Sequence, residues 1–295
     1  MRRGDNFGDF IFAPYCDYIR KYGCNKDNLD FSLFAQEKFT AYASAEDSIR
    51  YFLNKFEDET FEKMIEWSSS KNYFLRRLSS EGTRAKLPWC QKINLDYKKT
   101  IQILDNLYFD KSRFVTRSVA NHLNDISKID SDLVIDVLEK WRISVETRQC
   151  LVSTDIDLDY IISHGTRTLV KVGNKRTLEF LGYSSNPQIE LKNFIITNRE
   201  VKIGEKLEFD FDIFLEKSES LIIDYKVYFV GKNGKLLPRV FKLKKIGGTQ
   251  GLLLQISKTH KLKLMSTKAL YTGTHFVEII INGNSFGKKE FELII

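Results

Sequence analysis

The sequence predicts an α-solenoid of paired helical repeats followed by an all-β sandwich. Apolar residues recur at three- and four-residue spacing up to about residue 183, and short alternating segments take over from about Pro187. A helical segment also recurs at intervals of 40 and 50 residues. The boundary is expected within 182–186, which gives domains 1–185 and 186–295.

The helices of the first domain are predicted from apolar periodicity, as in Leu133, Val134, Val137, Leu138 and Trp141. The segment Ser44-Ala45-Glu46-Asp47 resembles a capping box, so a helix is expected to start there. We expect outer helices near 58–70, 97–109, 131–143 and 175–182, and inner helices near 72–84, 112–128 and 157–173.

The helices fall into repeats. The segment 73–78 aligns with 113–118, and 115–119 aligns with 165–169. This spacing is typical of paired-helix repeats of the HEAT kind, in which equivalent helices line one concave face.

The second domain is predicted from alternation, which is clearest in 207–212, and from turn signals such as Asn282-Gly283-Asn284. Seven strands in about 110 residues favour an immunoglobulin-like sandwich. The expected strands are 193–197, 206–215, 221–230, 240–245, 251–257, 275–282 and 289–295.

Composition limits the class of protein. No apolar run is long enough for a membrane helix, and the N-terminus has no apolar core of a signal peptide. The four cysteines lack a Cys-x-x-Cys spacing, so we expect neither disulfides nor a metal site. A soluble monomer in the bacterial cytoplasm, associated with the nucleoid and not with a membrane, is expected.

The net charge of +7 is unevenly distributed, because residues 186–295 hold 18 Lys and Arg against 12 Asp and Glu. Such a basic domain favours an anionic partner, with nucleic acid the first candidate. The alternative is that the surplus only aids solubility. Lys242, Lys244 and Lys245 are expected on one strand face, where they would contact DNA phosphates.

The inner helices are basic. Arg77, Arg117 and Arg167 occupy equivalent positions, so they are expected to meet successive phosphates. The alternative is that each arginine pairs with a neighbouring acid inside the solenoid. The basic residues of these helices are Arg76, Arg77, Arg84, Arg113, Arg117, Lys128, Arg167 and Lys171.

Two acids interrupt the basic helices. Arg117, Asn121 and Asp125 share one helical face, which Lys128 continues, and Glu81 lies four residues after Arg77. A carboxylate on a phosphate-binding surface repels its ligand, so a catalytic role is one interpretation. An ordinary ion pair along the helix is the other.

Three segments carry a resemblance to a known family. They are Arg76-Arg77-Leu78-Ser79-Ser80-Glu81-Gly82-Thr83-Arg84-Ala85-Lys86-Leu87-Pro88-Trp89, Arg117-Ser118-Val119-Ala120-Asn121-His122-Leu123-Asn124-Asp125, and His164-Gly165-Thr166-Arg167-Thr168-Leu169-Val170-Lys171. Residues 35–183 thereby resemble the AlkC branch of bacterial DNA alkylation-repair glycosylases, some of which carry a C-terminal immunoglobulin-like domain.

The resemblance implies a HEAT-like fold that grips double-stranded DNA and excises cationic bases such as 3-methyladenine and 3-methylcytosine, without a cofactor. By motif, Asp125 is the expected catalytic carboxylate, with Glu81 and Glu46 as further active-site acids. The expected DNA-binding residues are Trp89, Arg167, Arg117, Arg77, Arg84, Asn121, Lys128 and Lys171.

The chemistry suits these residue types. A base that alkylation has made cationic is a good leaving group, and its departure leaves positive charge on the sugar. A fixed carboxylate stabilises that charge and orients or deprotonates the attacking water. Two alternatives stay open, a non-enzymatic sensor of alkylated DNA and a protein-binding HEAT-repeat scaffold. His122 and His164 are too isolated to indicate metal or triad chemistry.

Overall fold

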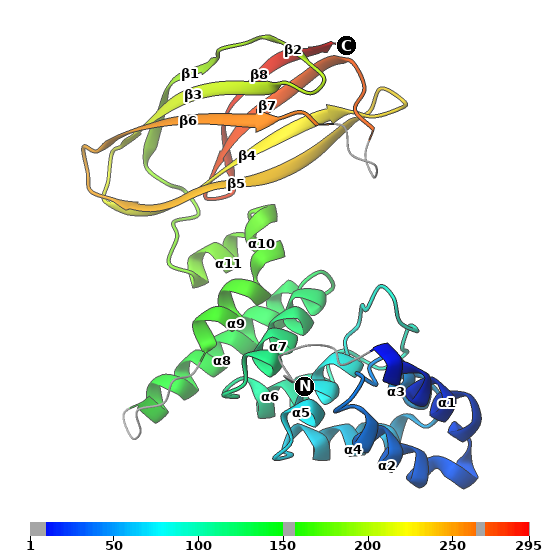
Figure 1. The fold of residues 1–295 in the computed structure, drawn as a ribbon. Helices are drawn as coiled ribbons and strands as arrows, with labels where there is room; N and C mark the ends of the chain where they lie inside the picture. Colours follow the sequence, from blue (N-terminus) through cyan, green and yellow to red (C-terminus); the bar gives the residue numbers. More distant parts are fainter. Residues whose placement is uncertain (1–9, 150–156, 264–268, 295) are drawn as a thin grey trace. The chain divides into compact units, whose positions relative to one another are not determined.

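Helices make up the first part of the chain and strands the second (Figure 1). The computed structural model describes residues 10–149, 157–263 and 269–294. Contacts within it divide the chain into two units, Met1–Leu169 and Val170–Ile295. The predicted boundary lies at 185/186, whereas the division falls earlier because Val170 and Leu178 pack against Ile222 of the β unit.

The helical unit consists of short helices that pack in sequence order. They are α1 (Ala13–Gly23), α2 (Leu29–Phe39), α3 (Ser48–Lys55), α4 (Glu57–Ser68), α5 (Tyr73–Gly82), α6 (Ile101–Leu107), α7 (Arg113–Ile126), α8 (Ser131–Gln149), α9 (Leu158–Gly165) and the start of α10 (Arg167–Val172), with 3-10 turns at Phe10–Phe12 and Lys26–Asn28. The predicted helices near 58–70, 72–84, 97–109, 112–128 and 131–143 are confirmed to within a few residues.

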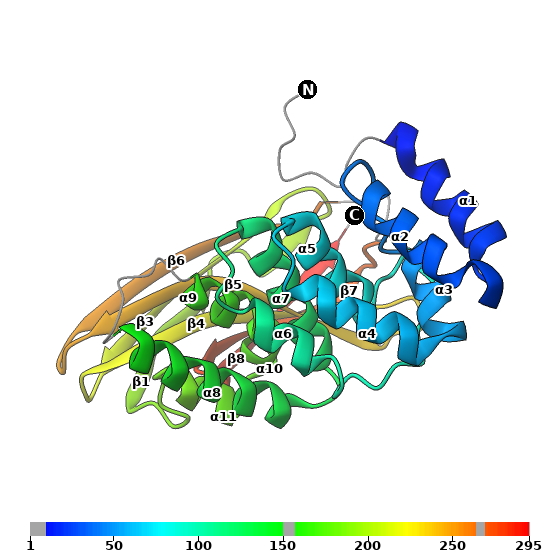
Figure 2. The ribbon, with the colours of Figure 1, turned by 90° about the horizontal axis from the view of Figure 1, so that it is seen from below.

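The order of contacts places α5, α7 and α9 next to one another, while α4 packs on both α5 and α6. Figures 1 and 2 both show α5 and α7 side by side. A glycine at the end of α5 also lets this helix pack closely on α3 and α4. A Cβ at Gly82 would lie 2.7 Å from Ile49 and 2.8 Å from Met64, so the end of α5 sits tightly against α3 and α4.

Two local predictions in this unit are wrong. The segment 157–173 is not one helix, because it is interrupted at Thr166, whose hydroxyl donates to the carbonyl of Ile162 at 2.7 Å. The proposed capping box does not cap a helix either. Helix α3 begins at Ser48, and the Ser44 hydroxyl instead donates to the Glu46 carboxylate at 2.8 Å.

The β unit is a sandwich of two sheets, in the strand orders β1-β3-β6 and β2-β8-β7-β4-β5. After α11 (Lys175–Phe180) come β1 (Ile189–Ile196), β2 (Glu200–Lys202), β3 (Lys206–Leu215), β4 (Glu219–Val230), β5 (Leu236–Gly248), β6 (Leu253–Lys261), β7 (Gly273–Ile281) and β8 (Asn284–Ile294). The seven predicted strands are confirmed with shifted ends, and β2, which pairs in parallel with β8, was not predicted.

The core of the sandwich lies between the sheets, as alternation predicts. Along β3, Leu207, Phe209, Phe211, Ile213 and Leu215 are buried while the residues between them are more exposed. They meet the inward side chains of β4, β7 and β8 in one cluster. This alternation fixes which side chains of each strand point to solvent.

A bulge in β5 overturns the prediction of a single lysine face. The strand register pairs Lys242 with Asp224 and Lys245 with Ile222, on the outer face of the sheet. Lys244 instead pairs with the core residue Ile223, because one residue is inserted between the two pairs. Only two of the three lysines therefore share a face.

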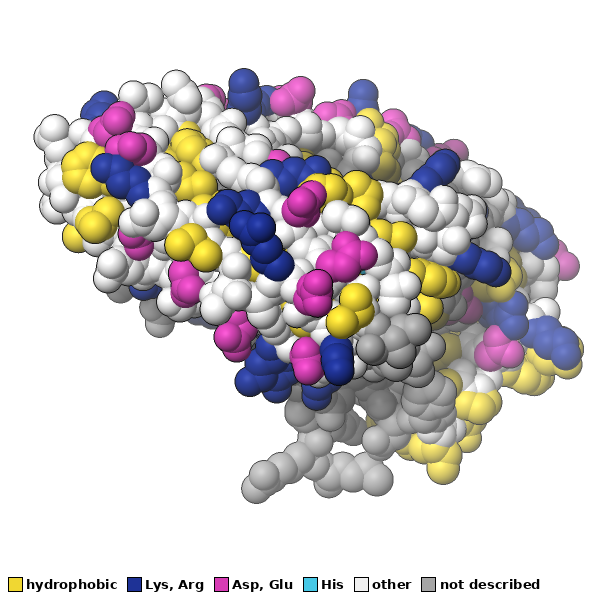
Figure 3. Space-filling model, turned by 90° about the horizontal axis from the view of Figure 1, so that it is seen from above, with side chains coloured by type: hydrophobic (Ala, Val, Ile, Leu, Met, Phe, Trp, Pro, Cys, Tyr) yellow, Lys and Arg dark blue, Asp and Glu magenta, His cyan; other side chains and the backbone are white. Residues whose placement is uncertain are grey.

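Within the described ranges, no helix is both long and apolar enough to span a membrane. On the face of the molecule that Figure 3 shows, Lys and Arg side chains are interspersed with Asp, Glu and apolar side chains. Charged side chains of both signs are therefore mixed on that face. The charges that bear on function are found in local clusters of residues.

Candidate active site

Five charged side chains lie buried beside α5, and we call them the buried charge network: Glu46, Arg77, Glu81, Arg84 and Asp125. Each is at most 9% exposed. Helix α5 and the turn after it supply Arg77, Glu81 and Arg84, whereas Asp125 comes from α7 and Glu46 from the segment before α3. The fold thus gathers all three predicted acids around two arginines.

Glu46 lies at one end of the network. Its Oε2 accepts from Nη2 of Arg77 at 2.8 Å and from the hydroxyl of Ser44 at 2.8 Å. Nη1 of Arg77 also donates to Ser44 Oγ at 2.9 Å. These charge-assisted contacts hold the Glu46 carboxylate against the first turn of α5.

Asp125 lies at the other end. Its Oδ2 accepts from Nε and Nη2 of Arg84, at 2.9 and 2.7 Å, and its Oδ1 accepts from Lys128 Nζ at 3.0 Å. Nη1 of Arg84 donates to Oε1 of Glu81. Oε2 of Glu81 accepts from Ser118 Oγ at 2.6 Å and lies 3.9 Å from Arg77. The network is therefore continuous from Glu46 to Asp125.

The buried charges of the network do not cancel by themselves. Three carboxylates face two buried guanidiniums, and the exposed Lys128, which pairs with Asp125 at 3.0 Å, supplies the third positive charge. Burial alone would raise the pKa of Glu81, but Arg77 and Arg84, together with the Ser118 hydroxyl, hold that pKa below its ordinary value. The Glu81 carboxylate is therefore charged at neutral pH.

Two exposed side chains contact the network from the solvent side. Nε1 of Trp89 donates to Oε1 of Glu46 at 3.2 Å, although the tryptophan side chain is 66% exposed. Lys128, also exposed, reaches Oδ1 of Asp125. The network therefore lies just below the protein surface, and one oxygen of each terminal acid is shielded by a side chain that a ligand can reach.

Sequence reasoning missed the residue that positions this surface. Arg50 of α3 is 1% exposed, and its Nη1 donates to the carbonyls of Gly82 and Arg84 at 3.1 and 2.8 Å. Its Nε donates to the carbonyl of Gln91. One guanidinium thus ties the end of α5 to the loop that carries Trp89. Its partners are backbone carbonyls, which no side-chain spacing reveals.

His122 lies fully buried behind the network on α7. Its Nε2 is 3.2 Å from the hydroxyl of Thr100, which itself donates to the Tyr97 carbonyl at 2.6 Å. Burial, reinforced by the nearby Arg84 charge, lowers the pKa of His122 to about 4. The ring is therefore neutral at physiological pH and adds no charge to the network.

The predicted residues of α7 and of the start of α10 form a second, partly exposed group. Oδ1 of Asn121 accepts from Nη2 of Arg167 at 3.1 Å and lies 3.0 Å from Nε2 of His164. Arg117, one turn before Asn121, is exposed. Burial lowers the pKa of Arg167, which nevertheless stays protonated. Asn121 thus orients a cation at the surface.

Of the three arginines expected to meet successive phosphates, Arg77 is buried, Arg167 is half-buried and Arg117 is exposed. Arg77 and Arg84 are buried against carboxylates, Arg76 pairs with Asp110, and Arg113 pairs with Asp157. These four arginines fit the alternative interpretation, in which each arginine pairs with a neighbouring acid. Lys171 is exposed and belongs to the β unit.

No group of three or more His, Cys, Asp or Glu side chains suited to a metal occurs among the residues that the structure describes. Cys16, Cys24 and Cys90 are free thiols, and Cys150 lies outside the described residues. Burial raises the pKa of Cys16 to about 11 and that of Cys90 to about 12, so neither is a reactive thiolate at neutral pH.

Both units of the chain are similar to known proteins. Residues 16–152 match the family model described as DNA alkylation repair enzyme, and residues 190–295 match the C-terminal immunoglobulin-like domain of the uncharacterised protein YhaZ. YhaZ of Bacillus subtilis is 32% identical over 280 residues, covering 94% of this chain and 75% of YhaZ.

A solved structure is similar over nearly the whole chain. It is the alkylpurine DNA glycosylase AlkC of Pseudomonas fluorescens, bound to DNA that contains an abasic-site analogue. The TM-score is 0.88 with 31% identity, covering 97% of this chain and 78% of AlkC. Both units therefore have counterparts in an alkylpurine DNA glycosylase.

Proposed function

This chain belongs to the AlkC branch of the DNA alkylation repair enzyme family, and we propose on that premise that it is a DNA glycosylase for cationic alkylated bases. The proposed substrates are 3-methyladenine and 3-methylcytosine in double-stranded DNA. The observation that carries the proposal is the buried charge network, whose third carboxylate is balanced only by the exposed Lys128, on a surface that also bears Trp89 and Arg117.

The proposed reaction uses that charge directly. As the bond between C1′ and the base breaks, the base takes the electron pair and leaves neutral, and positive charge develops on the sugar. Carboxylates that are already fixed stabilise this charge without reorganising. A water molecule then adds to C1′ and gives up its proton to a carboxylate.

Asp125 is the proposed catalytic carboxylate. Arg84 holds its Oδ2 through two nitrogens, whereas its Oδ1 contacts only the exposed Lys128 among the described residues. A lysine at the surface is free to turn toward a DNA phosphate, and Oδ1 would then face the sugar. Glu81, held by Arg84 and Ser118, would keep Arg84 in place and add negative charge.

Glu46 and Trp89 would complete the site. The hydrogen bond from Nε1 to Oε1 orients the exposed indole ring, which offers a flat apolar face to the lesion or its sugar. A ring face also attracts a cationic base. Arg167, Arg117, Asn121, Lys128 and Lys171 are the proposed contacts to DNA, with Arg77 and Arg84 acting through the carboxylates that they hold.

The proposal includes the architecture and setting. The helix pairs α4–α5, α6–α7 and α8–α9 are proposed to be HEAT-like repeats, since α5, α7 and α9 contact one another in order. The domains are proposed to act together, as a cytoplasmic monomer on the nucleoid. No cofactor is proposed, because the cationic base needs no electron sink or metal to depart.

The deciding experiment measures base release from duplex DNA containing 3-methyladenine or 3-methylcytosine. Asp125→Asn is expected to lower single-turnover release by about 10²–10³-fold, the usual loss when one fixed electrostatic group is removed, while DNA affinity is retained. Glu62→Gln, an exposed acid on α4, is the matched control and should keep the wild-type rate.

Other outcomes decide between the alternatives. Full activity of Asp125→Asn rejects its catalytic role. Tight binding without release by the wild type points to a sensor. Affinity for plain duplex DNA that is insensitive to salt points to a protein-binding scaffold, since phosphate contacts must release counterions.

A further inference from the structure

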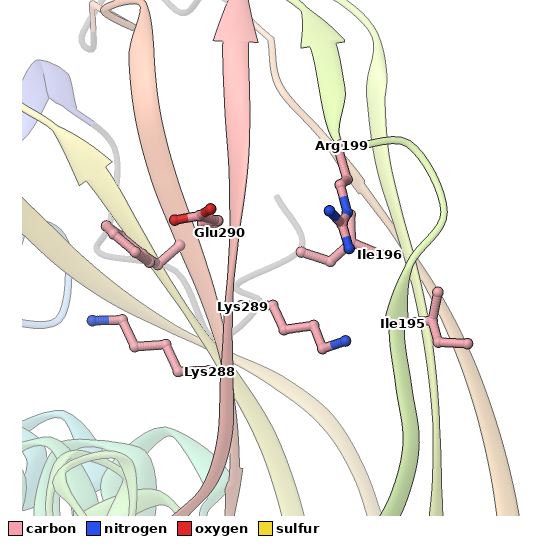
Figure 4. A pocket seen from close by; sticks show the side chains of 7 residues that line it. Ile195, Ile196, Arg199, Lys288, Lys289 and Glu290 are labelled. Atoms are coloured by element: carbon pink, nitrogen blue, oxygen red, sulfur yellow. The ribbon is translucent and has the colours of Figure 1, made fainter.

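The β unit contains a hollow of about 420 Å³ beside strand β8, remote in sequence from every residue of the buried charge network. Its walls are the end of β1, the segment before β2, and neighbouring residues of β7 and β8. The lining residues are Ile195, Ile196, Arg199, Phe276, Lys288, Lys289 and Glu290. In Figure 4, Arg199 and Lys289 lie on one side of β8, and Lys288 and Glu290 lie on the other.

The cations of the hollow are not held in ion pairs within the described residues, although Glu290 also lines the hollow. No ion pair of Arg199, Lys288 or Lys289 is found in the part of the chain that the structure describes. The lysines contact aromatic rings, with Lys288 4.2 Å from the Tyr228 ring centre and Lys289 5.6 Å from that of Phe194. In the same sheet Lys226 does pair, at 3.1 Å from Glu278.

The backbone beside the hollow has unused donors. Strand β2 pairs only with Glu292–Ile294, so the preceding part of β8 has no strand partner on that edge within the described ranges. The N–H of Glu292 points to this edge, since it donates to the Arg199 carbonyl at 2.7 Å. By the two-residue period of a strand, the N–H groups of Glu290 and Lys288 point the same way.

We propose that this hollow binds a phosphate group. Two like charges, Arg199 and Lys289, on one side of β8 repel each other, and an anion between them removes that repulsion. A tetrahedral phosphate accepts from a guanidinium, an ammonium and backbone N–H groups together. The proposal rests on the proposed function in one respect, because duplex DNA is the expected source of the phosphate.

The test uses the full chain with the double substitution Arg199→Gln and Lys289→Gln, which removes both charges and leaves shorter, polar side chains. The matched control is Lys232→Gln with Lys235→Gln, two exposed lysines of the β4–β5 turn, which removes the same charge elsewhere in the unit. Arg199→Lys with Lys289→Arg keeps the charge and shows whether loss of folding explains any defect.

The first measurement is affinity for undamaged duplex DNA over a series of salt concentrations. The Gln double variant is expected to weaken binding about tenfold and to lower the salt slope by about one, since the loss of one phosphate contact removes about one from that slope. The control should change affinity less than threefold, and the charge-keeping variant should bind like the wild type.

The second measurement separates the two sources of phosphate. Inorganic phosphate is expected to raise the melting temperature of the wild type more than chloride at equal ionic strength, and not that of the Gln variant. A phosphate effect with unchanged DNA affinity supports a free phosphate as ligand. Neither effect, or equal losses in the Gln and control variants, overturns the proposal. Base release measured separately on damaged DNA would still decide the proposed function.

Discussion

The buried charge network of the helical unit and the hollow beside β8 contain the same kinds of side chain in opposite settings. In the first, Arg77 and Arg84 are buried and each touches at least one carboxylate. In the second, Arg199 and Lys289 line an open hollow without an ion-pair partner in the described structure. Buried charges are fixed before the ligand arrives, whereas exposed ones act mainly through long-range attraction.

The difference separates two tasks that a DNA-processing protein must perform. Electrostatic stabilisation of a reaction requires charges that do not move and are little screened by salt. Attraction of a polyanion requires accessible charge, and it weakens as salt rises. Salt should therefore affect binding by the β unit far more than the rate of reaction at the network.

The largest effect on stability is expected from a substitution that disrupts the buried charge network itself. Arg84→Met leaves Glu81 and Asp125 buried without their shared cation, so the free energy of unfolding should fall by about 3–5 kcal/mol. Denaturant unfolding of the full chain measures this. Lys128→Met, which removes an exposed partner of the same Asp125, should cost less than about 1 kcal/mol. Equal stability of the two variants would contradict the distinction between buried and exposed pairs.

Asp224 sharpens the comparison, because it is a buried acid of the β unit for which the described residues supply no direct ion pair. Burial raises its pKa to about 6, although Lys242 partly offsets this. A carboxyl whose folded pKa lies above its unfolded value of 3.8 destabilises the fold as pH rises through that interval. Asp224→Asn should thus stabilise the chain by about 2–3 kcal/mol at pH 8 and by nothing at pH 4.

The pH dependence of unfolding for Asp224→Asn measures this difference. Equal stabilisation at both pH values would mean that charge burial is not the cause.

His122 is expected to give the helical unit the opposite pH dependence of stability to that of Asp224, because its contribution is lost as pH falls. Its folded pKa of about 4 lies below the ordinary value of 6.5, so the fold favours the neutral ring. The stability this gives is complete above pH 6.5 and is lost as pH falls toward 4. Between pH 7 and 5 the wild type should lose about 2 kcal/mol that His122→Gln does not lose. Parallel stability curves for the two proteins would refute this assignment.

The smallest effect concerns the exposed rim of the network. Trp89→Phe keeps an aromatic ring but removes the hydrogen bond to Glu46, a bond worth about 1 kcal/mol at an exposed position. Base release at limiting enzyme should therefore slow about fivefold, and Trp89→Ala should slow it further. If the two variants lose the same amount, orientation by Glu46 would matter and the ring would not.

Much of the fold follows from the sequence because most elements have strong periodicity. Strand β3 alternates without interruption, and α7 buries Val115, Val119 and Ile126 on one stripe. The features that were missed lack such a signal. Strand β2 has three residues, and the bulge in β5 depends on how that strand pairs with β4.

The site was predictable only in part. The motif that contains Glu81 and Trp89 identified residues that the fold does bring together with Glu46 and Asp125. Their partners were not predictable, because helical spacing shows which residues share a face but not what lies opposite. Arg84 meets Asp125 from 41 residues away, and Arg77 meets Glu46 from 31.

The bulge in β5 has a consequence for the whole chain in the cell. Strand β5 lies at the end of its five-stranded sheet, with Pro238 and exposed lysines along it. An outermost strand of 13 residues could template pairing with a neighbouring molecule. The inserted residue twists the strand, the proline removes a donor, and the lysines repel a second copy, so the unit is protected against aggregation at that edge.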